Sequence, residues 1–82
     1  MKAEITFKQL YWNKGLMNFF FREQAQQTLE DLIERSTEFE RDVVDKLDDV
    51  TRDWDIDDLE ELFYSEGTVD VAEELGIPLI EY

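Results

Sequence analysis

Residues 37–54 read TEFERDVVDKLDDVTRDW, and this stretch predicts the best-defined helix of the chain. Thr37 and Glu40 have the spacing of a capping box, in which each side chain accepts a hydrogen bond from the backbone amide of the other residue. Apolar residues then recur at steps of four, four, three and four, as on one buried helical face, at Phe39, Val43, Leu47, Val50 and Trp54. Carboxylates occupy an arc of about 60° on the solvent side of the same helix. They are Glu38, Asp42, Asp45 and Asp49.

The sequence after this stretch predicts two shorter helices and a strand. Asp53 and Asp55 are suitable N-caps for a third helix, whose inner face holds Ile56, Leu59, Leu62 and Phe63. Residues 65–68 read as a break. One or two further helical turns then contain Thr68, Val71, Ala72 and Leu75 and end at Gly76. Residues 77–82 read as an edge strand, where Pro78 is tolerated.

The sequence before residue 37 is aromatic and reads differently. In residues 3–8, apolar Ala3, Ile5 and Phe7 alternate with polar residues, which indicates a half-buried strand. Residues 13–15 (Asn-Lys-Gly) read as a turn. Residues 16–20 fit either the second strand of an N-terminal hairpin or the first turns of a helix, and we favour the strand. From about Phe21, apolar spacings of four, four and three predict a helix that extends to about residue 35.

Together these elements predict one α+β domain over residues 1–82. Its short N- and C-terminal strands would pair and pack against three to four helices. The 82 residues include 11 aromatic residues and only three glycines and one proline, which argues for a folded core.

Several chemistries are disfavoured by what the sequence lacks. The chain has no cysteine and no histidine, so thiol catalysis, cysteine zinc sites and the commonest general base are absent. It also has no glycine-rich phosphate loop. We therefore expect no enzyme activity, no metal and no cofactor. Lys2 is not followed by an apolar signal segment, and no apolar run approaches the length of a membrane span, so we expect a cytoplasmic protein.

One short segment partly matches a calcium-binding loop. Asp53, Asp55 and Asp57 occupy positions 1, 3 and 5 of an EF-hand pattern. The required glycine at position 6 is Asp58, and the required glutamate at position 12 is Tyr64. An acidic helix N-terminus explains this segment better than a calcium loop does.

Acidity is the main functional signal in the sequence. Residues 30–74 hold 19 of the 22 acidic residues and four basic ones, a formal charge of −15 within a total of −14. This charge disfavours direct binding to nucleic acids or anionic membranes and favours a basic partner protein. A helix that holds carboxylates at regular spacing can imitate a phosphate backbone, although an acidic face that only keeps the protein soluble is the plain alternative. The first four predicted contacts are Glu38, Asp42, Asp45 and Asp49, and the secondary ones are Asp31, Glu34, Asp53, Asp57, Asp58 and Glu61.

The aromatic segment 7–21 is the rival binding surface. Nine large apolar residues in 15 positions exceed what one small sheet face can bury. We expect most of them in the core and name Trp12, Phe19 and Phe20 as candidates for an exposed contact. The alternative function is therefore a protein–protein interaction module or homodimer that uses this segment.

In size, acidity, helix-borne carboxylates and lack of Cys and His, the chain resembles small phage-encoded inhibitors that mimic DNA, such as anti-CRISPR, anti-restriction and uracil-glycosylase inhibitor proteins. The resemblance covers the charge pattern of residues 30–74 and no residue-level motif. It implies a non-catalytic inhibitor that occupies the basic nucleic-acid-binding groove of a host defence or DNA-processing protein. These inhibitors share no common fold, so the resemblance implies none here.

Overall fold

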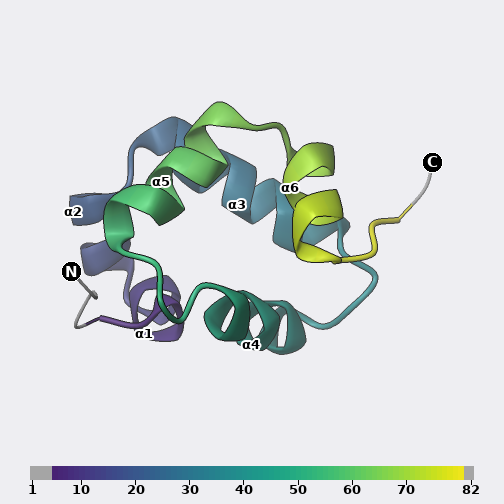
Figure 1. Cartoon of the computed structure of the whole chain (residues 1–82), viewed down its shortest axis with the longest axis horizontal. Coiled ribbons are helices and arrows are strands. Elements are labelled where there is room, and N and C mark those ends of the chain that lie inside the picture. The colour runs from purple at the N-terminus through teal and green to yellow at the C-terminus, as the bar shows by residue number, and fades with distance from the viewer. Residues whose placement is uncertain (1–4, 81–82) are drawn as a thin grey trace.

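The computed structural model describes residues 5–80, and these residues form six α-helices without a sheet (Figure 1). The helices are α1 (Phe7–Trp12), α2 (Lys14–Phe20), α3 (Glu23–Arg35), α4 (Glu40–Val50), α5 (Ile56–Ser65) and α6 (Thr68–Leu75). The predicted α+β class is therefore wrong. Of the residues predicted as strand, 3, 4, 81 and 82 lie outside the described part of the chain, and the others form helix or irregular backbone apart from a single bridge at Leu79.

The predicted N-terminal strand is a helix because Thr6 and Gln9 form a capping box. The Thr6 hydroxyl accepts a hydrogen bond from the Gln9 amide at 3.2 Å, and the Gln9 side chain accepts one from the Thr6 amide at 3.1 Å. Helix α1 then begins at Phe7 and buries Phe7, Leu10 and Tyr11 at helical spacing. The alternation of Ile5 and Phe7 therefore did not reflect a sheet face.

Residues 16–20 belong to a second helix, so the strand that we favoured there is wrong. The side chain of Asn13 accepts a hydrogen bond from the Leu16 amide at 3.2 Å and caps α2. Met17 and Phe21 are buried, one helical turn apart. Helix α2 ends at Phe20 with Phe21 as its C-cap, and α3 begins at Glu23 rather than at Phe21.

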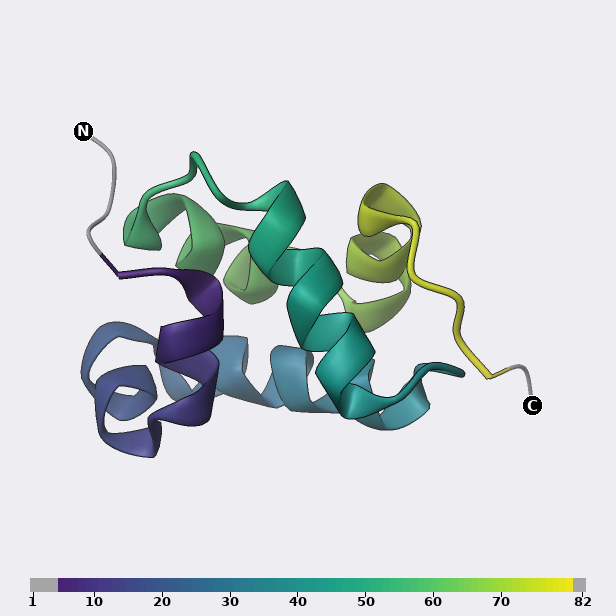
Figure 2. The ribbon, with the colours of Figure 1, turned by 90° about the horizontal axis from the view of Figure 1, so that it is seen from below.

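Five of the six helices pack in two layers, and α2 packs against α1. Helices α3, α5 and α6 pack together in one layer, and α1 and α4 pack together in the other (Figure 1). Seen from the side of α4, this helix lies across the first layer (Figure 2). The molecule measures 38 × 22 × 21 Å, and its radius of gyration of 11.7 Å matches the value of about 11.7 Å expected for a compact chain of this length.

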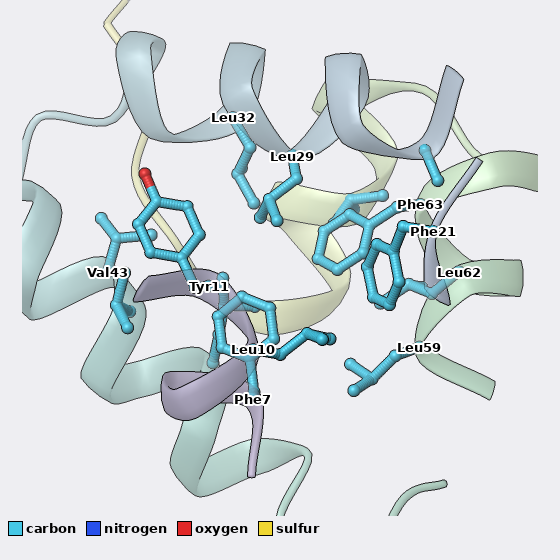
Figure 3. Packing of buried hydrophobic residues seen from close by; sticks show 14 of the residues in the cluster. Phe7, Leu10, Tyr11, Phe21, Leu29, Leu32, Val43, Leu59, Leu62 and Phe63 are labelled. Atoms are coloured by element: carbon cyan, nitrogen blue, oxygen red, sulfur yellow. The ribbon is translucent and has the colours of Figure 1, made fainter. Parts of the chain in front are cut away.

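The core lies between the layers and is centred on Phe63 of α5. Its ring centroid lies 6.4 Å from the rings of both Phe7 and Phe21. Leu29 and Leu32 extend from α3 into the same cluster (Figure 3). Three segments that are distant in sequence therefore meet at one aromatic side chain.

Helix α4 begins later than predicted, and its buried face is rotated. Phe39 is its N-cap and provides no side-chain hydrogen bond, so the predicted Thr37–Glu40 capping box does not form. Val43, Val44 and Leu47 are buried, whereas Phe39 is 77% exposed and Val50 46% exposed. The apolar stripe was thus correct at positions 43 and 47 and wrong at positions 39 and 50.

Within its described residues, 77–80, the predicted C-terminal strand forms one antiparallel bridge, between Leu79 and Ser36. The Thr37 amide donates to the Pro78 carbonyl at 3.1 Å, and the Ile80 amide donates to the Arg35 carbonyl at 2.7 Å. The C-terminal segment therefore lies along the α3–α4 connection instead of pairing with the N-terminus. The Thr37 amide is thereby unavailable to the Glu40 side chain, which instead accepts a hydrogen bond from the Tyr11 hydroxyl.

The predictions for the last two helices are confirmed. Asp55 caps α5, and its side chain accepts a hydrogen bond from the Asp58 amide at 2.9 Å. Leu59, Leu62 and Phe63 are buried on its inner face. Helix α6 ends at Gly76, which adopts the left-handed conformation with φ of 70°.

Candidate functional site: the acidic faces of α4 and α5

Helix α4 presents carboxylates on the side opposite its buried face. Asp42, Asp45 and Asp49 are exposed and fall within an arc of about 60°. Since Val43 and Leu47 face the core, these carboxylates point away from it. Glu38 was predicted to lie on the same helix, but it precedes α4 and is half-buried. The predicted row of four thus consists of three residues on the helix and one in the connection before it.

Three of these four carboxylates are engaged in salt bridges within the chain. The distances are 2.7 Å for Lys8–Asp45, 2.7 Å for Lys46–Glu38 and 3.3 Å for Arg52–Asp49. Cations of the chain therefore offset most of the predicted acidic row. Within residues 5–80, Asp42 alone of the four forms no salt bridge.

Helix α3 contributes two predicted contacts of different character. The Asp31 carboxylate accepts a hydrogen bond from the Thr68 hydroxyl at 2.6 Å and lies 3.4 Å from the Arg35 guanidinium. It therefore connects α3 to the start of α6 and serves the fold. Glu34 is exposed and forms no salt bridge with any described residue.

Helix α5 carries a second acidic face that is not neutralised. Asp57, Asp58 and Glu61 are exposed and form no salt bridge in the described part of the chain. They lie within about one turn of each other, and Asp57 and Glu61 are four residues apart on the same side of the helix. Asp53 is also exposed and lies in the connection before α5. Since α4 and α5 belong to different layers (Figure 1), their outward faces point to different sides of the molecule.

Most of the basic side chains form salt bridges with carboxylates of the same chain. Of the seven basic residues in positions 5–80, six form salt bridges. These six are Lys8, Lys14, Arg22, Arg35, Lys46 and Arg52. Arg41 forms none with any residue of that range. None of these cations forms a salt bridge with Asp57, Asp58 or Glu61, although Arg22 lines a surface hollow together with Asp57 and Glu61.

A surface hollow of about 390 Å³ lies beside this face, and the sequence did not predict it. Its lining consists of Trp54, Asp58, Glu61, Leu62, Ser65 and Glu66. Trp54, Asp58, Glu61 and Ser65 recur at steps of four, three and four, as residues on one helical face do. This spacing is the sequence signal that could have predicted the hollow. That signal was missed because Trp54 was assigned to the apolar stripe of α4.

A neighbouring hollow on α5, which shares Glu61 and Ser65 with the first, is lined by an arginine of the chain itself. The Arg22 guanidinium carbon lies 4.5 Å from the centre of the Tyr64 ring, and Nε lies 3.1 Å from a carboxylate oxygen of Glu60. The Arg22 amide also donates to Glu60 at 3.0 Å. An aromatic ring and a carboxylate of α5 therefore already bind a guanidinium in this second hollow.

Among residues 5–80, three ionisable groups have pKa values displaced from their ordinary range. A hydrogen bond with Glu74 raises the pKa of Glu66, with further contributions from burial and from the charges of Glu74 and Asp70. Burial and a hydrogen bond to Glu40 raise the pKa of Tyr11. The hydrogen bond with Asp45 raises the pKa of Lys8. Glu66 is the one of these groups that lines the hollow.

The aromatic segment is mostly core, as predicted, with two exposed exceptions. Phe19 is 79% exposed and Trp12 is 55% exposed. Phe20 is half-buried and packs against the core, and its ring meets that of Phe19 edge-on at 4.9 Å between centroids. Of the three candidate contacts, Phe19 and Trp12 are therefore available on the surface, and Phe20 is only partly so.

Residues 5–80 hold neither a cluster of metal ligands nor a membrane-spanning helix. This range contains no group of three or more Asp, Glu, His or Cys side chains positioned to hold a metal ion. Helix α5 begins at Ile56, inside the segment that partly matched a calcium loop, and Asp55 serves as its cap. None of the helices in this range has the length and hydrophobicity needed to cross a bilayer.

These features define a small acidic helical domain with two separate anionic faces. A scan against models of protein families and searches of curated proteins and of solved structures found no match for this chain. Inferences about its function therefore depend on the residues and their geometry alone.

Proposed function

We propose that the protein is a non-catalytic inhibitor that occupies the basic nucleic-acid-binding groove of a partner protein. The observation that carries this proposal is the acidic face of α5. Its three exposed carboxylates, Asp57, Asp58 and Glu61, form no salt bridge with any residue in positions 5–80. Carboxylates held on a packed helix present negative charge at fixed positions, as a phosphate backbone does.

The principal contact is assigned to α5 rather than to α4. Glu38, Asp45 and Asp49 would have to exchange an internal salt bridge for one with the partner, which offsets up to about 1 kcal/mol of the gain on binding for each of these exposed pairs. Asp57, Asp58 and Glu61 have no such bond to lose within the described residues. Asp42 and the remaining carboxylates then contribute long-range attraction, which is screened over about 8 Å at physiological salt.

Capture from a bacterial lysate tests this proposal, with elution by a short DNA duplex at constant ionic strength. A protein bound through its nucleic-acid groove is released by the duplex, and less of it binds as salt rises. The triple variant D57N/D58N/E61Q should capture little of it. The control variant E34Q/D42N/E73Q loses the same charge from exposed carboxylates outside α5 and should retain most of it. Failure to capture any protein that the duplex releases would contradict the proposal.

A second candidate function is assembly through the aromatic segment, and the exposure of Phe19 and Trp12 favours it. It predicts a dimer or complex that persists at high salt, since burial of apolar surface does not weaken as charges are screened. Sedimentation of wild type and Phe19→Ser at low and high salt separates the two functions. A salt-resistant dimer that Phe19→Ser disrupts supports assembly, and a monomer at every concentration contradicts a homodimer.

A further inference from the structure

The hollow beside α5 combines an apolar wall with an acidic rim. Trp54 and Leu62 provide aromatic and aliphatic surface, whereas Asp58, Glu61 and Glu66 provide carboxylates. No lysine or arginine of the described chain lines it. A side chain that matches this lining must carry a positive charge at the end of an apolar stem.

The chain itself shows how α5 binds such a group. In the neighbouring hollow, which shares Glu61 and Ser65 with this one, the Arg22 guanidinium stacks over Tyr64 and pairs with Glu60. The hollow offers the same two kinds of group, an aromatic residue and carboxylates of α5. Trp54 takes the place of Tyr64, and Glu61 is adjacent in sequence to Glu60.

We propose that the hollow receives an arginine side chain of the basic partner. The inference rests on the proposed function to the extent that it assumes a basic partner. Arginine fits better than lysine because its planar guanidinium stacks on aromatic rings and can bind a carboxylate through two hydrogen bonds. Its methylene groups can pack against Leu62 while the charged end meets the acidic rim. A volume of about 390 Å³ is within the range of sites that hold small ligands.

Titration with two peptides of equal charge tests this choice of side chain. The probes are hexa-arginine and hexa-lysine, and the protein carries Trp12→Phe so that Trp54 is the remaining tryptophan. Hexa-arginine should change the Trp54 fluorescence saturably and bind several-fold more tightly than hexa-lysine. Equal affinity for the two peptides, or binding without any change at Trp54, would overturn the proposal.

A matched pair of charge variants then locates the binding site of the hexa-arginine peptide. D58N/E61Q removes two carboxylates from the rim, and E34Q/D42N removes two exposed carboxylates elsewhere. The rim variant loses two exposed ion pairs with the peptide, so its affinity for hexa-arginine should fall by about fivefold to tenfold. The control should lose about twofold or less, through the smaller net charge. Equal losses in the two variants would show that the peptide is attracted by the overall negative charge of the protein, and would contradict a specific arginine site in the hollow. A melting curve for each variant establishes that it is folded.

The outcomes separate this inference from the proposed function. Selective binding of hexa-arginine at the hollow would stand even if no captured protein were released by a DNA duplex. Conversely, DNA-displaceable capture through α5 without any preference for arginine would leave the proposed function intact and would overturn the arginine site in the hollow.

Discussion

Lys8 of α1 forms a 2.7 Å salt bridge with Asp45 of α4, and its backbone amide donates to Asp48 at 3.2 Å. Two carboxylates of α4, of which only Asp45 belongs to the predicted acidic row, thus hold α1 in place. Part of the charge on α4 therefore serves the fold, and this is why we assign the free anionic surface to α5.

Replacing Lys8 with Gln should lower the melting temperature by a few degrees at low salt. The side chains of this pair are about half exposed, so the effect should shrink in about 1 M salt, where charges are screened beyond about 3 Å. Thermal melts at the two salt concentrations measure it. The double variant K8Q/D45N should recover part of the loss, because it leaves no unpaired partner. An equal loss at high salt would show that Lys8 acts through packing instead.

Phe63 and Phe19 should respond very differently to the same substitution. Phe63 is fully buried between Phe7 and Phe21, so Phe63→Leu should destabilise the protein by about 1–2 kcal/mol. Phe19 is 79% exposed, and Phe19→Leu should change stability by less than about 0.5 kcal/mol. Urea unfolding measures both. A similar loss in the two variants would place the core elsewhere.

Gly76 should be the glycine that tolerates alanine least. Its φ of 70° lies in the left-handed region, where a side chain costs about 1–2 kcal/mol even though nothing lies within 4 Å of the added Cβ. Gly67 provides the matched control, because its φ of −76° suits any residue and its Cβ would also meet nothing. Gly67→Ala should be near neutral in the same unfolding assay. Near-neutral behaviour of Gly76→Ala would argue against this helix end.

The Glu66–Glu74 pair should make the protein more stable in mild acid than at neutral pH. The folded state raises the pKa of Glu66 above its ordinary value of 4.5, so the folded chain binds a proton more readily than the unfolded chain does. Stability from this group therefore rises as pH falls from neutral toward 4.5, and it is lost again as pH rises. Glu66→Gln should raise the melting temperature at pH 7 and reduce its dependence on pH.

Glu73→Gln is the control for this effect, since it makes the same change in charge on an exposed side chain of α6. Its melting temperature should keep the pH dependence of the wild type. If both variants lost the dependence equally, overall charge repulsion rather than the Glu66–Glu74 contact would be responsible.

The elements that the sequence predicted well are those with local signals. Asp55 and Gly76 mark the ends of α5 and α6 through bonds and conformations that involve only neighbouring residues. Thr6 and Gln9 carried an equally local signal for α1 that was overlooked in favour of the alternation of Ile5 and Phe7. Thr37 was misleading, because its amide bonds with Pro78, 41 positions away in the chain, which no local pattern reveals.

The candidate site likewise has some features that the local sequence predicts and others that depend on tertiary packing. The sequence predicts that Asp57, Asp58 and Glu61 are exposed acids, since they follow a cap and avoid the apolar face of α5. It does not reveal that Lys8 neutralises Asp45, because the two residues are brought together only by the packing of α1 on α4. It likewise does not place Trp54 beside α5, since this depends on how the α4–α5 connection turns.

The central claim is that the protein and a nucleic acid compete for one groove. The most direct measurement uses a captured protein that the DNA duplex releases, purified and bound to a fluorescent duplex. Fluorescence anisotropy should fall to the value of free DNA as wild-type protein is added, D57N/D58N/E61Q should displace far less, and E34Q/D42N/E73Q should resemble the wild type. A ternary complex that retains the DNA, or equal displacement by both variants, would contradict the account.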